Sequence, residues 1–370
     1  MKRLPVVIVL LAWFAAPASA DLDTGLAAYE RGDYATAWRE LKPLAENGAV
    51  RAQYILGFMY DNGRGIPQDF KEALRWFRLA ADQGYAPAQF NVGGMYSFGR
   101  GVPEDFKEAR RWFRLAADQG DARAQYRLGL LYAHGQGIPQ DYKEAHRWYR
   151  LAAEQRNADA QLNLGLMYDE GQGVSQDQKE ARRWYRLAAD QGNARAQFNL
   201  GLLYNNGEGG SQDYKEAHRW YRLAAEQGNA RAQFNLGVLY ANGQGVPQDY
   251  KEALRWYRLA ADQGDALAQL GLGVLYGKGQ GVPQDYKEAH RWYHLAADQG
   301  NAHAQLRLGV LYANGQGVPH DFVQAYLWLS LAAAQGEKRA SDARDQFVGI
   351  MSKSEIEEAQ RLAREWKPKQ

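Results

Sequence analysis

The chain has 370 residues, of which 46% are hydrophobic and 24% are charged, as in ordinary globular proteins. Its 45 basic and 43 acidic residues give a formal net charge of +2, and 43 of each remain if Lys2 and Arg3 are removed with a leader segment. This balance argues against a nucleic acid or an anionic membrane as partner. The absence of cysteine excludes disulfides, thiol catalysis and thiolate metal sites.

Residues 1–20 have the pattern of a secretory signal peptide. Lys2 and Arg3 precede an almost wholly apolar run, and Ala18-Ser19-Ala20 has the small-x-small form of a cleavage site. An uncleaved membrane anchor is the alternative, but the run is shorter than the roughly 20 residues that a spanning helix needs. We expect cleavage near Ala20, a periplasmic or secreted bacterial protein, and no membrane insertion afterwards.

Residues 21–48 predict a short helix pair ahead of the main pattern. Tyr29, the turn Gly32-Asp33-Tyr34 and Ala37 are spaced as in two helices joined by a tight turn. We expect this pair to cap the N-terminal end of the array that follows.

Residues 49–336 repeat eight times with a period of 36 residues. A tyrosine marks each unit without a slip, at Tyr60, Tyr96, Tyr132, Tyr168, Tyr204, Tyr240, Tyr276 and Tyr312. A period of roughly 20–50 residues is the signature of a stacked repeat protein, in which each unit contacts only its neighbours. Such a protein is a scaffold with a long inner surface, so binding is expected rather than catalysis.

The first half of each unit predicts a helix, as residues 193–206 illustrate. Asn193 can cap the helix, and its apolar face includes Gly201 and Tyr204. A glycine inside a helix costs about 1 kcal/mol relative to alanine, so its recurrence in every unit implies that a second helix crosses too closely for a side chain. The loop with Gly207 and Gly209 ends this helix and allows positive backbone angles.

The second half of the unit predicts another helix, from Asp213 to the stop at Gly228. Glu216 follows Asp213 by three residues, which resembles a capping box. An apolar face with Trp220 and several alanines completes the hairpin.

A lone hairpin cannot cover these apolar faces, so neighbouring units must stack. We expect the rings of Tyr204 and Trp220 to pack against the small residues Gly201, Ala217 and Ala224. The fold class is therefore predicted to be all-α, a right-handed α/α superhelical solenoid of 36-residue helix hairpins.

Residues 337–370 leave the repeat pattern. The sequence predicts two helices, Ala340 to Met351 and Ser354 to Trp366, with Ser354 as the cap of the second. We expect them to seal the last unit against water, followed by a loose tail over residues 367–370.

The repeat resembles the Sel-one-like repeat family, a relative of the tetratricopeptide repeats, and residues 21–48 resemble an ordinary tetratricopeptide unit. The resemblance rests on Ala-x-x-Leu-Gly-x-x-Tyr, Gly-x-Gly-Val-Pro-x-Asp and Ala-x-x-Trp-Tyr-x-x-Ala-Ala-x-x-Gly, over residues 49–336. It implies an adaptor or scaffold without a common active site. Exported bacterial members are associated with envelope regulation, polysaccharide export and contact with host proteins. Cysteine-rich members are linked to β-lactam binding or hydrolysis, but this chain lacks their disulfides.

In tetratricopeptide folds the first helix of each pair lines a concave groove. By that analogy, the candidate groove residues lie two and six positions before the glycine of the motif: Asn91, Arg123, Arg127, Asn163, Arg195, Asn199, Arg231 and Asn235. Asparagine can donate to and accept from the backbone of an extended peptide, and arginine can hold a carboxylate with two bonds. The expected partner is another protein or peptide.

Arg123 and Arg127 lie four residues apart and hence on one helix face, with Asn91 expected nearby. They resemble half of the carboxylate clamp of some tetratricopeptide co-chaperones, since Tyr54 and Phe58 replace the lysine and asparagine of the other half. In the alternative interpretation, the asparagines support packing between units and the arginines are simply solvated.

No catalytic, cofactor or metal site is predicted. His146, His218 and His290 lie two units apart from one another, too far to converge on one ion, and the pair His290 and His294 has no evident third ligand. The alternative function is a cell-envelope hydrolase or a carbohydrate- or β-lactam-binding protein. It would need a convergent pair of acids and a break in the repeat, and the units show no such break.

Overall fold

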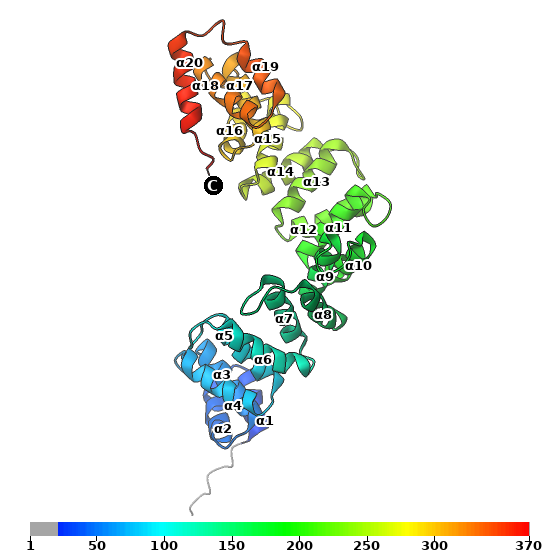
Figure 1. Ribbon diagram of the computed structural model, residues 1–370, viewed down its shortest axis with the longest axis vertical. Helices are drawn as coiled ribbons and strands as arrows, with labels where there is room; N and C mark the ends of the chain where they lie inside the picture. The colour runs from blue at the N-terminus through cyan, green and yellow to red at the C-terminus, as the bar shows by residue number, and fades with distance from the viewer. Residues whose placement is uncertain (1–20, 370) are drawn as a thin grey trace, which may run out of the picture. The chain divides into compact units, whose positions relative to one another are not determined.

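The computed structural model describes residues 21–369, so the expected signal peptide lies outside the described residues. Over this range the chain forms twenty α-helices joined by loops and turns (Figure 1). It divides into two compact units, Met1–Asn157 and Ala158–Gln370. In each, consecutive helices pair as hairpins that stack in chain order, so the predicted all-α solenoid is confirmed.

The helices of the first unit form four hairpins. They are α1 (Leu22–Glu30), α2 (Tyr34–Glu46), α3 (Val50–Asn62), α4 (Phe70–Asp82), α5 (Ala86–Ser97), α6 (Phe106–Asp118), α7 (Ala122–His134) and α8 (Tyr142–Glu154).

The second unit has five hairpins followed by two further helices. They are α9 (Ala158–Glu170), α10 (Gln178–Asp190), α11 (Ala194–Asn206), α12 (Tyr214–Glu226), α13 (Ala230–Asn242), α14 (Tyr250–Asp262), α15 (Ala266–Lys278), α16 (Tyr286–Asp298), α17 (Ala302–Asn314), α18 (Phe322–Ala334), α19 (Lys338–Asp345) and α20 (Lys353–Glu365). None of the helices within residues 21–369 has the length and apolar character that a membrane span requires.

The ends of the helices follow the local sequence. Asn193 caps α11 by accepting from Ala196 N at 3.0 Å, and the helix ends at Gly207, whose φ is +77°. Asp213 caps α12 by accepting from two backbone amides at 3.0 and 3.1 Å. The capping-box prediction was wrong for Glu216, whose side chain instead accepts from Trp220 Nε1 at 3.1 Å. Asp213 therefore caps the helix without a reciprocal bond.

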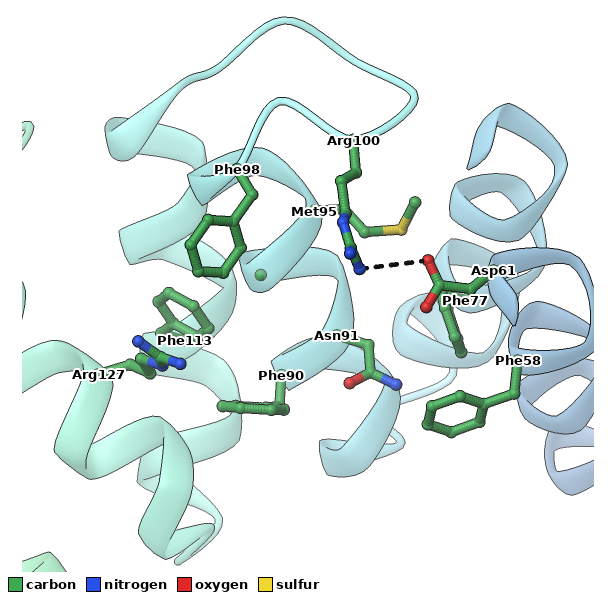
Figure 2. A pocket seen from close by; sticks show the side chains of 11 residues that line it. Phe58, Asp61, Phe77, Phe90, Asn91, Met95, Phe98, Arg100, Phe113 and Arg127 are labelled. Carbon is green, nitrogen blue, oxygen red and sulfur yellow. Dashed lines mark ion pairs between the residues drawn. The ribbon is translucent and has the colours of Figure 1, made fainter. Parts of the chain in front are cut away.

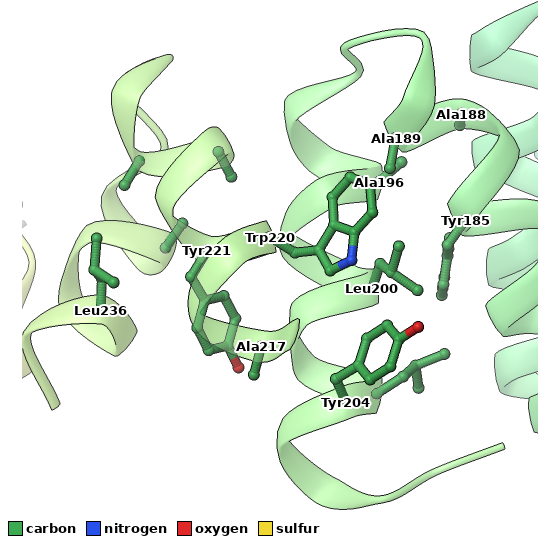
Figure 3. Packing of buried hydrophobic residues seen from close by; sticks show 14 of the residues in the cluster. Tyr185, Ala188, Ala189, Ala196, Leu200, Tyr204, Ala217, Trp220, Tyr221 and Leu236 are labelled. Carbon is green, nitrogen blue, oxygen red and sulfur yellow. The ribbon is translucent and has the colours of Figure 1, made fainter. Parts of the chain in front are cut away.

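Each motif glycine is covered by an aromatic or aliphatic side chain of the second helix. A Cβ added at Gly201 would lie 2.6 Å from the Tyr221 ring, which explains why glycine recurs inside the helix. The expectation that Tyr204 or Trp220 covers Gly201 was wrong. Trp220 is buried in a cluster with Ala189, Ala196 and other residues of the preceding second helix and the first helix (Figure 3).

The adjacent glycines Gly93 and Gly94 of α5 test this packing in one turn of helix. A Cβ at Gly93 would lie 2.7 Å from the Phe113 ring, whereas one at Gly94 would meet nothing within 4 Å. We expect Gly93→Ala to lower the free energy of unfolding by about 1–3 kcal/mol, because overpacking forces the ring to shift. Gly94→Ala, the matched control, should leave it unchanged or raise it by up to about 1 kcal/mol. Equal unfolding curves for the two variants would contradict the ring contact.

In seven first helices, a buried glutamine joins three helices. Gln125 of α7 is 5% exposed; its Nε2 donates to Ala117 O at the end of α6 at 3.2 Å. Its Oε1 accepts from Gln155 Nε2, which follows α8, at 2.8 Å. The same donation to the preceding second helix, at 3.1–3.4 Å, is made by Gln53, Gln89, Gln197, Gln233, Gln269 and Gln305. Each bond gives a second donor to a carbonyl at the end of the preceding second helix, which also accepts from the backbone N–H of the glycine three residues later, as Ala117 O does from Gly120 N at 2.9 Å.

Replacing Gln125 with methionine should destabilise the protein, although the side chain keeps about the same size. Gln125→Met removes one of the two donors to Ala117 O and leaves Gln155 Nε2 without its acceptor, so we expect the free energy of unfolding to fall by about 1–3 kcal/mol. Chemical denaturation monitored by circular dichroism measures the change. The control is Gln136→Met, at an exposed loop glutamine, which should unfold like the parent protein. We call the two hydrogen bonds of each buried glutamine side chain the glutamine relay. A parent-like unfolding curve for Gln125→Met would show that this relay adds no stability.

The C-terminal segment differs from the sequence prediction in three places. Helix α19 is shorter than predicted and starts at Lys338, and α20 is capped by Ser352, not Ser354, in a capping box with Glu355. The tail is anchored rather than loose: Lys369 N donates to Asp298 O at 2.8 Å, and Lys369 Nζ lies 2.7 Å from Asp298 Oδ2.

The two helices cover the last hairpin. Ala340 of α19 is buried with Leu306 and Leu329, and Ala359 of α20 is buried with Tyr326. Trp366 meets Trp328 with ring centroids 6.3 Å apart.

Truncation after Gly336 should expose these apolar side chains and promote aggregation, because terminal units of a repeat array need a polar outer face. Light scattering and a thermal melt measure the effect. Truncation after Trp366, which removes only the tail, is the milder comparison and should leave a monodisperse protein. A fully folded, soluble protein ending at Gly336 would contradict the capping role of residues 337–370.

Candidate functional site

All eight candidate residues lie on first helices, and they form one set in each unit. Asn91 lies on α5, and Arg123 and Arg127 lie on α7 of the first unit. The remaining five lie in the second unit on α9, α11 and α13, namely Asn163, Arg195, Asn199, Arg231 and Asn235. We call the surface formed by the first helices of a unit its first-helix face.

The first-helix face of the first unit contains a cavity of about 170 Å³ (Figure 2). Its walls are mainly aromatic, and its lining includes Phe58, Asp61, Phe77, Phe90, Asn91, Met95, Phe98, Arg100, Phe113 and Arg127. The first helices α3, α5 and α7 supply the sides, and the rings that cover the motif glycines come from α4 and α6. The predicted proximity of Asn91 and Arg127 is therefore observed.

The two arginines of α7 differ in their partners. Arg123 Nη2 lies 2.7 Å from Asp121 Oδ2, and its guanidinium lies over the Phe90 ring at 4.4 Å. The hydrogen bond with Asp121 raises the pKa of Arg123. Arg127 faces the Phe98 ring at 5.8 Å and has no ion-pair partner within residues 21–369. Of the two, Arg127 is therefore the one without a carboxylate that competes with an incoming anion.

Asn91 is the polar group inside the aromatic cavity. It lies near the Tyr54 hydroxyl, but not in hydrogen-bonding geometry, and its Nδ2 is buried without a partner among the described residues. Burial raises the pKa of Tyr54, and the charge of Arg123 opposes that shift. The tyrosine is therefore neutral near pH 7, and it packs edge-on against Phe58 with centroids 4.8 Å apart.

The equivalent asparagines of the second unit lie beside tyrosine hydroxyls. Burial raises the pKa of Tyr221, and the Asn235 amide beside its oxygen opposes the shift. Asn199 has the same effect on the pKa of Tyr185, whose hydroxyl donates to Asp169 Oδ2 at 3.0 Å. Each of these two asparagines therefore lies against the tyrosine of the preceding hairpin.

The arginines of the first-helix face in the second unit are exposed. Arg195 and Arg231 have no ion-pair partner in the part of the chain that the structure describes. On the second helices, by contrast, arginines pair with the glutamate three residues earlier at 3.1–3.6 Å, as in Arg75, Arg111, Arg147, Arg183, Arg219, Arg255 and Arg291. Other cations of the second helices, such as Lys71, Arg78 and Arg110, have no ion pair within residues 21–369, so the lack of an ion pair does not by itself distinguish the first-helix face.

Helix α15 departs from this polar pattern. Leu267 and Gly271 occupy the positions that hold arginine and asparagine on α11 and α13. They line an open cavity of about 370 Å³ together with Phe234, Val238 and Tyr257. Burial raises the pKa of Tyr257 to about 12, so its hydroxyl is neutral as well. The first-helix face therefore changes chemistry along the second unit.

Sequence reasoning missed Phe98 and Asp61 as parts of the site. Phe98 is 63% exposed, and Asp61 Oδ1 lies 3.7 Å from Arg100 Nη1 (Figure 2). Alignment of the units would have revealed Phe98, because the same position holds Asn62, His134 and other polar residues elsewhere.

The histidines make local contacts. His218 Nε2 lies 3.1 Å from the Tyr240 hydroxyl, and His294 Nδ1 lies 3.3 Å from Asp298 Oδ2. Within residues 21–369 no three His, Cys, Asp or Glu side chains are grouped so that they could hold a metal ion.

A stacked array of like hairpins with a variable first-helix face defines a helical repeat scaffold, a class that typically serves protein interactions. The Sel1 repeat matches residues 50–85, 86–121, 122–157, 158–193, 194–229, 230–265, 266–301 and 302–337. The chain belongs to the Sel1 repeat family.

Two solved structures are similar over most of their length. A Sel1 repeat protein from Oxalobacter formigenes is 35% identical, over 88% of this chain and 93% of its own, with a TM-score of 0.63. A protective antigen of uropathogenic Escherichia coli with an SLR fold is 31% identical, over 93% of this chain and 90% of its own, with a TM-score of 0.53. No curated protein matches the chain.

Proposed function

We propose that this protein is an exported, non-enzymatic scaffold that binds an extended segment of another protein along its first-helix faces. The observation that carries the proposal is the position of three arginines on first helices. Arg127, Arg195 and Arg231 lie there without ion-pair partners among residues 21–369, at positions where the residue type changes from unit to unit. Free guanidiniums beside apolar side chains favour a peptide that carries acidic groups.

Export is supported by the N-terminal sequence, with its basic start, apolar run and Ala18-Ser19-Ala20. The relative from uropathogenic Escherichia coli is described as a protective antigen. A periplasmic or surface-exposed role for the present chain is consistent with both. The absence of cysteine fits a scaffold that relies on packing alone.

The proposal is tested by removing arginines from first helices and, in a separate variant, from second helices. The protein, purified after export from an expressing bacterium, is used to capture and identify its partner from a cell-envelope extract. The dissociation constant of the purified pair is then measured by calorimetry. Arg195→Ala/Arg231→Ala should weaken binding by about tenfold or more, because each lost charge-assisted hydrogen bond is worth about 1.5–3 kcal/mol before any solvent compensation.

The matched control is Arg183→Ala/Arg219→Ala, which removes the same charge from second helices and should change the affinity by less than about twofold, since exposed ion pairs contribute little. Both double variants should have the parental melting temperature. Equal affinities of the two variants for the partner, or a larger loss in the control, would refute binding along the first helices.

A further inference from the structure

Resting on the proposed function, we propose that the aromatic cavity of the first unit is an anchor pocket for one large apolar side chain of a bound protein segment, flanked by acidic side chains. The pocket consists of the cavity of about 170 Å³ between α3, α5 and α7 together with Arg123 and Arg127 beside it. All of these residues lie in the first unit.

The apolar part of the recognition comes from an unusual concentration of phenylalanine. Phe58, Phe77, Phe90 and Phe98 line the cavity (Figure 2), and the 63% exposure of Phe98 leaves a large apolar ring in solvent at that point. In the second unit the residues equivalent to Phe58 are leucine or valine, at Leu166, Leu202, Val238, Val274 and Val310. Burial of an apolar side chain among these rings would remove the exposed ring from water.

The hydrogen-bonding contribution to recognition depends on one residue that differs between the two units. The ring over the motif glycine is Tyr185 or Tyr221 in the second unit, and its hydroxyl meets Asn199 or Asn235 fourteen residues later. In the first unit Phe77 takes this place and has no hydroxyl to offer Asn91. Asn91 lies beside the Tyr54 hydroxyl instead, without a hydrogen bond to it, and its Nδ2 is buried with no partner among residues 21–369.

A buried donor without a partner is costly, and a ligand that supplies an acceptor removes that cost. The backbone carbonyl of an extended segment would supply it while the segment's apolar side chain enters the cavity. This combination suits a peptide better than a purely apolar molecule, which would leave Asn91 unsatisfied.

The charged residues around the pocket favour particular residues on either side of the bound apolar side chain. Arg100, Arg123 and Arg127 outnumber Asp61 and Asp121 by one, and Arg127 has no ion-pair partner within the described chain. Arg123 and Arg127 are one helical turn apart, so they present two cations along the segment rather than one point of attachment. Acidic side chains on both sides of the apolar residue match this spacing better than a single terminal carboxylate.

The test uses labelled ten-residue peptides in a glycine–serine background, with leucine or phenylalanine at the centre between two glutamates. Fluorescence anisotropy with the full exported protein should detect binding that weakens with rising salt. A central serine, or lysines in place of the glutamates, should weaken it by about tenfold or more, a difference of at least 1.4 kcal/mol. A peptide with the same leucine at its C-terminus and no glutamate should bind more weakly, which separates acidic side chains from the terminal carboxylate.

Two variants borrow residues that the chain already uses elsewhere, so the fold should accept them. Phe77→Tyr gives Asn91 the hydroxyl found at Tyr221, and Arg127→Asn installs the residue found at Asn199. Each should weaken the glutamate-flanked peptides by about fivefold or more at an unchanged melting temperature. Arg111→Asn, on a second helix, removes the same charge and should bind like the parent.

Peptides that do not bind the parent protein, or that bind equally with lysine flanks, would overturn the anchor pocket. So would parental affinity in both Phe77→Tyr and Arg127→Asn. The proposed function fails separately, if the captured partner binds the Arg195→Ala/Arg231→Ala variant as tightly as the parent.

Discussion

Within each unit, the fold depends on a buried amide that ties a hairpin to the one before it. Gln197 lies at 4% exposure between the end of α10 and the glutamine that follows α12, and it bonds to both. A side-chain amide is one of the few groups that can donate and accept at once in such a place. Because this glutamine relay recurs at 36-residue steps within each unit, it fixes the spacing of neighbouring hairpins there.

The glycine and ring pair sets the second constraint, within the hairpin. Tyr221 lies against Gly201, so the second helix can approach only where no Cβ is present. Together the glutamine relay and the ring contact use the inward positions of both helices. They leave other positions of the first helix and the residue that ends it free to vary, and it is there that Phe98, Arg127, Leu267 and Gly271 differ from their equivalents. Specificity can therefore change without loss of the stack.

Much of the fold could be predicted because each local sequence signal recurs in the eight units. The caps at Asn193 and Asp213 and the left-handed glycine at Gly207 follow from single residues and were predicted correctly. The choice between Trp220 and Tyr221 as the ring over Gly201 was missed, because adjacent residues on one helix differ in direction by about 100° and periodicity alone does not say which faces the partner.

Contacts between residues that are distant in sequence were not predicted. The anchored tail depends on contacts of Trp366 and Lys369 with Trp328 and Asp298, which are distant in sequence. The glutamine relay was visible as a polar residue recurring on an apolar helix face, but its partners are backbone carbonyls, which no side-chain pattern reveals. At the site, Arg127 and Asn91 were predicted as candidate residues. Their lack of partners was not predicted, because the effect of having phenylalanine at position 77 depends on a contact between two helices that the sequence pattern does not reveal.

The function proposed here is that of a repeat scaffold in which a repeated interior supports a binding face that varies from unit to unit. Hydrogen exchange of the protein with and without its partner tests this most directly. Backbone amides of the first helices α5, α7, α11 and α13 should gain protection on binding, while those of α6, α10 and α12 exchange at the unbound rate. Protection confined to the second helices would contradict the account.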